Sequence, residues 1–149
     1  MTIAEMIVGT WCLGVTLADV YARRIPNILT LGMCLIAMCW LLVSGHSMLN
    51  ATMQSAFLGA TISLLLTLPA YAARLLGAGD VKLLLAIALI SGWYLTLLAF
   101  VIAALLAVIV GVAYLLVYRL RTQPLSRKRW LPFGAALSVG LLVAIGITK

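Results

Sequence analysis

The stretch VKLLLAIALISGWYLTLLAFVIAALLAVIVGVAYLLVY, residues 81–118, decides the fold of this chain. It is about twice as long as the roughly 20 apolar residues that one helix needs to cross a lipid bilayer. The stretch is therefore either one very long helix or two helices joined by a tight turn. If there is a turn, we expect it at SGWY, residues 91–94.

The basic residues decide between these two structures. They fall in clusters between apolar runs: Arg23 with Arg24, Arg74 with Lys82, and a group at 119–129. Basic residues concentrate in the cytoplasmic loops of membrane proteins. All of the clusters can face the cytoplasm only if an even number of crossings separates each from the next. The sequence therefore predicts that the long apolar stretch crosses the membrane twice.

The composition indicates a membrane protein throughout. Hydrophobic residues make up 66% of the 149 residues and charged residues 9%, whereas a soluble domain is about half apolar and a quarter charged. The cytoplasmic loops account for the net charge of +7, so we expect no nucleic acid partner. We predict one all-α domain, residues 1–149, with six transmembrane helices, both termini outside and basic loops in the cytoplasm. The predicted spans are 3–21, 28–44, 52–72, 81–91, 94–118 and 132–148.

Two of the three acidic residues lie where charge is costly. Asp19 ends the first predicted span, and Asp80 begins the fourth. The topology places both at cytoplasmic helix ends, where the bundle could bring them together. Two carboxylates that share a site do not both ionise readily, so one keeps its proton. The ionised one could activate water while the protonated one polarises a scissile carbonyl, which would hydrolyse a peptide without metal, serine or cysteine.

Structural roles remain open for the same residues. Asp80 would also suit a helix N-cap, where its carboxylate meets the positive end of the helix dipole. Asp19 could pair with Arg23, four residues later. Gly77 and Gly79 permit backbone angles that other residues avoid and would let an extended substrate approach Asp80, but they could equally serve only to break a helix.

Three segments resemble motifs of the type IV prepilin peptidase family. GAGDVKL at 77–83 resembles the Gly-x-Gly-Asp motif of intramembrane aspartic proteases, and DVYARRIPNILT at 19–30 resembles the family's other aspartate signature. LPFGAALSVG at 131–140 resembles the Pro-Phe-Gly segment of its last helix. The resemblance therefore covers nearly the whole chain.

The resemblance implies a function. Members of the family remove the short basic leader of type IV pilin and pseudopilin precursors at the cytoplasmic face of the bacterial inner membrane. The cut usually follows a glycine and precedes the apolar helix of the precursor. By this resemblance Asp19 and Asp80 are the catalytic pair, and no metal or other cofactor is implied.

The resemblance also assigns residues around this pair. Gly77 and Gly79 would shape the active-site loop, and Lys82 matches a lysine of the family for which we assign no chemical role. The remaining motif residues are expected to be structural, with Pro26 ending one helix and Asn27 capping the next. These are Arg23, Arg24, Pro26, Asn27, Pro132 and Gly134.

This sequence departs from the family's pattern in two ways. Larger members carry a cytoplasmic zinc-binding region with paired Cys-x-x-Cys motifs and also methylate the new pilin N-terminus. This sequence has no such motif, so it resembles the minimal members that are peptidases only, such as those of Flp (tight-adherence) pili. It also has Ala135 where many members have proline, a difference that we do not expect to affect the chemistry.

Two other functions remain open. A small proton-coupled transporter would use an intramembrane acid as a relay, although such carriers favour acids at the midplane and often show an internal repeat, which this sequence lacks. A non-enzymatic scaffold for pilus or secretion assembly would tolerate the loss of both aspartates. The expected partners are a prepilin or pseudopilin precursor, the lipid bilayer and, for the basic group at 119–129, the pilus assembly machinery.

Overall fold

The computed structural model describes residues 2–22, 25–74, 76–120 and 133–148, without the side chains of 117–120. In these residues the protein is helical apart from short turns and one isolated bridge between His46 and Thr52. The helices are α1 (Ile3–Ala22), α2 (Asn27–Ser44), α3 (Met53–Ala72), α4 (Ala78–Leu120) and α5 (Phe133–Ile147). The first four are long and apolar enough to cross a membrane, and α5 is a shorter apolar helix. The chain is therefore an all-α, multi-pass membrane protein.

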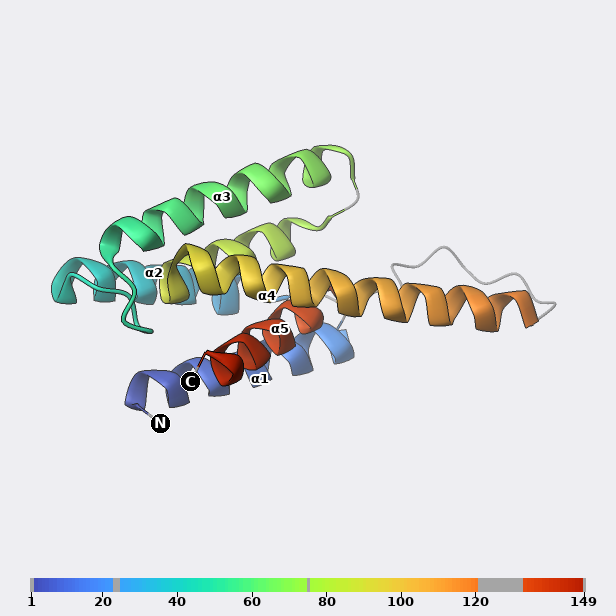
Figure 1. Ribbon diagram of the computed structural model, residues 1–149, viewed down its shortest axis with the longest axis horizontal. Helices are drawn as coiled ribbons and strands as arrows, with labels where there is room; N and C mark the ends of the chain where they lie inside the picture. The colour runs from blue at the N-terminus through green and yellow to red at the C-terminus, as the bar shows by residue number, and fades with distance from the viewer. Residues whose placement is uncertain (1, 23–24, 75, 121–132, 149) are drawn as a thin grey trace.

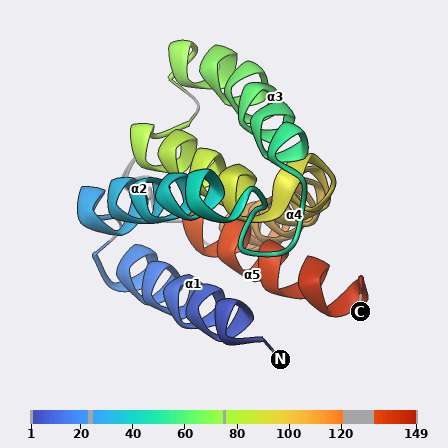
Figure 2. The same cartoon turned by 90° about the vertical axis from the view of Figure 1, so that its left-hand side faces the viewer.

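The helix ends lie close to the predicted spans, and α4 contains the predicted turn. Gly92 has φ 78° and ψ 176°, angles that no helix contains, so α4 consists of two helical segments that meet at this residue. The two segments run back alongside one another (Figures 1 and 2). The structure thus reverses the chain inside SGWY, while the number of membrane crossings remains a prediction.

Neighbouring side chains and backbone groups surround the reversal at Gly92. A methyl group placed on Gly92 would lie 2.5 Å from Ser55 Oγ and 2.7 Å from Ala51 Cβ. The Ser91 hydroxyl donates to the Ile87 carbonyl at 2.7 Å, and the Thr96 hydroxyl donates to the Gly92 carbonyl at 2.6 Å. Lipid offers no hydrogen-bond partner to a broken helix. These hydroxyl groups therefore supply hydrogen bonds on both sides of the break.

Small residues allow α4 to pack closely at the centre of the bundle. α4 contacts α2, α3 and α5, whereas α1 packs mainly against α5. A methyl group on Gly59 of α3 would lie 2.9 Å from the Trp93 backbone nitrogen, and one on Gly140 of α5 would lie 2.5 Å from the Ala99 carbonyl oxygen. Lipid tails are as apolar as the helices, so close backbone packing is a main source of association in a membrane.

The helix ends that carry the two aspartates lie at the same end of the bundle. The last turn of α1 and the first turns of α2, α4 and α5 lie at this end, whereas the first turn of α1 and the last turn of α5 lie at the other (Figure 1). We call the first the acid-bearing end, because Asp19 and Asp80 lie in these turns. Glu5 lies at the opposite end, where it forms a capping box with Thr2.

Candidate active site

The carboxylate of Asp19 is held by the first turn of α5. Asp19 is buried, with 7% of its surface exposed. Its Oδ2 accepts a hydrogen bond of 2.8 Å from the backbone N–H of Ala135, the third residue of α5. The first N–H groups of a helix have no partner within the helix and form its positive end. The start of α5 is therefore a binding site for the Asp19 carboxylate. Arg23 and Arg24 lie outside the described residues, so the predicted pairing with Arg23 stays untested.

Asp80 also lies at a helix N-terminus, but not as its N-cap. α4 begins at Ala78 and makes Asp80 its third residue. The Asp80 Oδ2 accepts a hydrogen bond of 3.1 Å from the backbone N–H of Gly77, just before the helix. This is the reciprocal half of a capping box, in which the third residue reaches back to the cap position. The N-cap interpretation is thus wrong in detail, because the helix begins two residues before Asp80.

Gly79 was expected to adopt unusual backbone angles, but in the structure it instead packs against Ile25. It lies inside the first turn of α4 and has no positive φ, so the expectation of unusual backbone angles is wrong for this residue. A methyl group on Gly79 would lie 3.6 Å from Ile25 Cβ, an ordinary van der Waals contact. Gly79 therefore marks the surface of α4 against which Ile25 packs.

Ile25 joins the surroundings of the two carboxylates. A methyl group on Gly134 would overlap Ile25 Cδ1 and would lie 3.1 Å from Asp19 Oδ2. The same Ile25 side chain meets Gly79, the neighbour of Asp80. Three segments far apart in the sequence therefore meet around one isoleucine. We did not single out this residue from the sequence, since only the contacts between helices identify it. Pro132, the neighbouring motif residue, lies outside the described part of the chain.

Lys82 and Asn27 form a second link between the two aspartate motifs. Lys82 Nζ donates a hydrogen bond of 3.1 Å to Asn27 Oδ1 at an exposed position. Asn27 is the first residue of α2, and Pro26 occupies the cap position without any side-chain cap bond. The prediction that Asn27 caps this helix is wrong, because its side chain binds Lys82. Pro26 itself lies four residues after the end of α1 at Ala22 and directly before α2.

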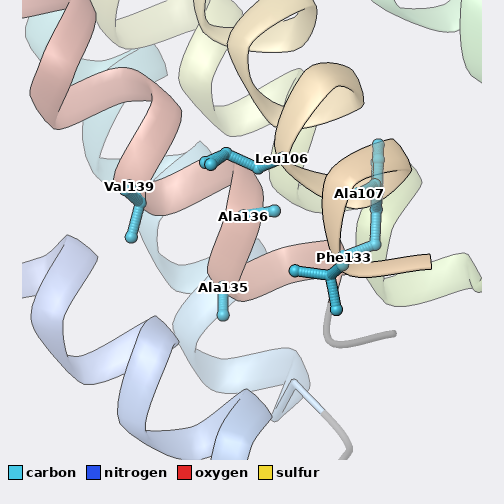
Figure 3. Close-up of a pocket in the computed structure, with 7 residues that line it drawn as sticks. Leu106, Ala107, Phe133, Ala135, Ala136 and Val139 are labelled. Carbon is cyan, nitrogen blue, oxygen red and sulfur yellow. The ribbon is translucent and has the colours of Figure 1, made fainter. Parts of the chain in front are cut away.

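An apolar hollow lies beside the bond between Asp19 and Ala135. Its volume is about 200 Å³ and its lining is almost wholly apolar. Ala135 belongs both to this hollow and to the Asp19 site, and the side chains of α4 and α5 face each other across it (Figure 3). A cavity of about 150 Å³ is enough to bind benzene, so the hollow has room for one large apolar side chain. The lining residues are Leu106, Ala107, Val110, Phe133, Ala135, Ala136 and Val139.

Ala135 matters through its backbone, and a proline there should reveal this. Ala135→Pro removes the N–H that binds Asp19, while the first turn of α5 does not need that N–H for its own bonds. We expect the free energy of unfolding to fall by about 1.5–3 kcal/mol, the usual contribution of a hydrogen bond to a charged group. Denaturant unfolding in detergent micelles measures this change.

The matched control for Ala135→Pro uses a chain that lacks the Asp19 carboxylate. In an Asp19→Ala background, the same proline should change the stability far less. An equal loss in both backgrounds would show that the proline strains the helix and that the bond to Asp19 contributes little.

Comparison with known proteins assigns this chain to a family. No curated protein and no solved structure matches the chain. A family model, however, matches residues 6–112, well over half of the chain, including Asp19, Ile25 and Asp80. This match covers the motifs at 19–30 and 77–83 and confirms their resemblance, and the chain belongs to the type IV leader peptidase family.

Proposed function

We propose that this protein cleaves the leader from prepilin and pseudopilin precursors and that Asp19 and Asp80 are its catalytic pair. The observation that carries the assignment is the contact of Ile25 with both Gly134, beside Asp19, and Gly79, beside Asp80. Each carboxylate accepts a backbone N–H at the start of a helix. The family match supports a leader peptidase, and this geometry supports the choice of residues.

The proposed reaction needs one proton shared between the two carboxyl groups. The ionised carboxylate takes a proton from water, and the resulting hydroxide attacks the scissile carbonyl while the protonated carboxyl group donates to the carbonyl oxygen. The C–N bond then breaks as the carboxyl group that took the proton from water gives it to the leaving amine. The other carboxylate takes back a proton from a hydroxyl group of the tetrahedral intermediate, so both groups return to their starting states. The backbone N–H groups of Ala135 and Gly77 hold the two carboxyl groups in place at the starts of their helices.

We place this reaction at the cytoplasmic face of the bacterial inner membrane. In this proposal the two segments of α4 each cross the bilayer, so that six spans put the acid-bearing end at the cytoplasm. The apolar hollow beside Ala135 suits the apolar part of a precursor that follows the cut. The protein acts as a peptidase alone, without the methyltransferase activity of the larger members, and serves pili of the Flp type.

The alternatives explain less of the geometry. A proton relay requires acids along a path across the membrane, whereas Asp19 and Asp80 both lie in turns at one end of the bundle. An assembly scaffold requires only the helix surfaces. It gives no reason for a carboxylate that is 7% exposed and bound by the N-terminus of another helix.

Cleavage of a precursor by the purified protein in lipid nanodiscs tests the proposal. We expect mass spectrometry to show one cut between the leader and the apolar helix, and we expect an Asp19→Asn, Asp80→Asn double variant to make none. Glu5→Gln is the matched control and should cleave normally, because glutamine also completes a capping box. A wild-type protein that leaves the precursor intact, or a double variant that still cuts it, would contradict the proposal.

A further inference from the structure

The helices that carry the two aspartates are held together mainly through other helices. In the described residues α1 packs mainly against α5 and only slightly against α2, whereas α4 packs against α2, α3 and α5. Asp19 lies on α1 and Asp80 on α4. The position of one carboxylate relative to the other therefore depends on the helices that contact both of these helices, which are α2 and α5.

The start of α2 binds the start of α4 through Lys82. Lys82 Nζ donates a hydrogen bond of 3.1 Å to Asn27 Oδ1, and the Cys34 thiol lies 3.8 Å from the Lys82 carbonyl oxygen. The side chain and the backbone of Lys82 therefore both face α2. Successive residues of a helix are about 100° apart around its axis. Fixing the direction of Lys82 thus also fixes the direction in which Asp80, two residues earlier, leaves α4.

The start of α2 also binds α1, through Trp11. The Trp11 Nε1–H donates a hydrogen bond of 2.8 Å to the Leu29 backbone carbonyl. Trp11 is 9% exposed and belongs to the buried face of α1, which also carries Asp19. Because α1 packs only slightly against α2, this bond fixes how far along and around its axis α1 lies against the start of α2.

We propose that the first turn of α2, residues 27–30, aligns the two carboxylates, with Lys82 and Trp11 as positioning residues. This inference rests on the proposed function, since it takes Asp19 and Asp80 as the catalytic pair. Two carboxyl groups that share a proton and activate one water molecule act only within a narrow range of separations. One turn of α2 that is bonded to both helices sets this separation, although neither Lys82 nor Trp11 takes part in the chemistry.

A double-mutant cycle tests the link between Lys82 and Asn27. Lys82→Met keeps the apolar stem and removes the donor, and Asn27→Ala removes the acceptor without uncapping α2, since Pro26 occupies the cap position. Each single variant should lower kcat for precursor cleavage by about tenfold to 10²-fold, the effect of a small displacement at a reacting centre, with KM near wild type. The double variant should cleave no more slowly than the slower single variant, because all three lose the same bond.

Unfolding temperatures and conservative variants separate alignment from a structural role. The bond lies at an exposed position, where substitutions change stability little, so all three variants should unfold close to the wild-type temperature. Lys82→Arg keeps a donor, Asn27→Asp keeps an acceptor, and both should retain most of the wild-type kcat. Losses of kcat that multiply in the double variant would overturn the inference, because the two residues would then act independently.

Trp11→Phe tests the link to α1. It keeps an aromatic ring and removes the N–H, so kcat per folded protein should fall by about tenfold or more, again with KM near wild type. Trp40→Phe is the matched control, because Trp40 lies on α2 and is 42% exposed; it should leave kcat unchanged. A wild-type kcat for Trp11→Phe would overturn the inference, since α1 would then be aligned without α2. If Trp11→Phe fails to fold, the cycle of Lys82 and Asn27 carries the test.

The wild-type reaction distinguishes failure of this inference from failure of the proposed function. If wild type cleaves the precursor and Lys82→Met cleaves it equally fast, the alignment by α2 is wrong and the peptidase function stands. If wild type leaves the precursor intact, the proposed function is wrong and this inference fails with it.

Discussion

Asp19→Asn and Asp80→Asn should each slow precursor cleavage by about 10²–10⁴-fold, the range expected for loss of a general acid or base. Asparagine keeps the size and polarity of aspartate but can neither take nor release a proton near neutral pH. The structure also shows why the fold should survive. The side-chain carbonyl of asparagine can still accept the Ala135 N–H at position 19 and the Gly77 N–H at position 80.

Single-turnover cleavage and thermal unfolding, measured on the same nanodisc samples, check this prediction. We expect unfolding temperatures close to wild type for both asparagine variants. Alanine at either position should lose the backbone hydrogen bond as well, and should lower stability together with activity. If one asparagine variant cleaves at a rate near wild type, that residue acts as a structural ligand of its helix terminus, and the two-aspartate mechanism fails.

Gly92→Ala should have the largest effect on folding. Gly92 has φ 78° and ψ 176°, a combination that essentially only glycine adopts and that costs other residues about 1–3 kcal/mol. Its added methyl group would also lie 2.5 Å from Ser55 Oγ and 2.7 Å from Ala51 Cβ, and overpacking of this kind costs about 1–3 kcal/mol. We therefore expect the free energy of unfolding to fall by about 2–6 kcal/mol, a large share of the roughly 5–15 kcal/mol that is typical of a folded protein.

Gly32→Ala is the matched control for the change at Gly92. Gly32 lies within α2, has no positive φ, and has no atom within 4 Å of an added methyl group. Alanine favours a helix over glycine by about 0.5–1 kcal/mol, so this variant should be as stable as wild type or more so. Denaturant titration and the yield of monodisperse protein report both variants. A Gly92→Ala protein with wild-type stability would show that the chain does not reverse at this residue.

The apolar runs and the charge clusters were enough to predict most of the helices. Each apolar run of membrane length became a helix, and the argument from charge placed a turn where Gly92 breaks α4. These features depend on residues that are close together in the sequence. The motifs also predicted the family correctly. They consist of particular residue types at fixed spacings, which can be recognised without knowing how the helices pack.

Contacts between distant segments could not be predicted from the sequence. Ala135 looked unimportant because its side chain carries no chemistry, yet its backbone N–H binds a carboxylate 116 positions away. Ile25 lies between two predicted spans and was not singled out from the sequence, and only the packing of α4 and α5 against it shows its place. The cap positions considered for Asp80 and Asn27 were wrong for a local reason, since a residue loses the cap position when the helix begins one or two residues earlier.

The break at Gly92 also affects the lipid around the protein. At 1.5 Å per residue, the segment 78–91 is about 21 Å long and the 15 residues of α5 about 22 Å, against roughly 30 Å for the hydrocarbon core. Both short helices begin beside a carboxylate. Bilayers thin around spans that are too short for them. If both helices cross the bilayer, as the proposed six-span topology requires, hydrophobic mismatch shortens the path of water to Asp19 and Asp80. The acyl-chain length of the host membrane then becomes a variable of the proposed reaction.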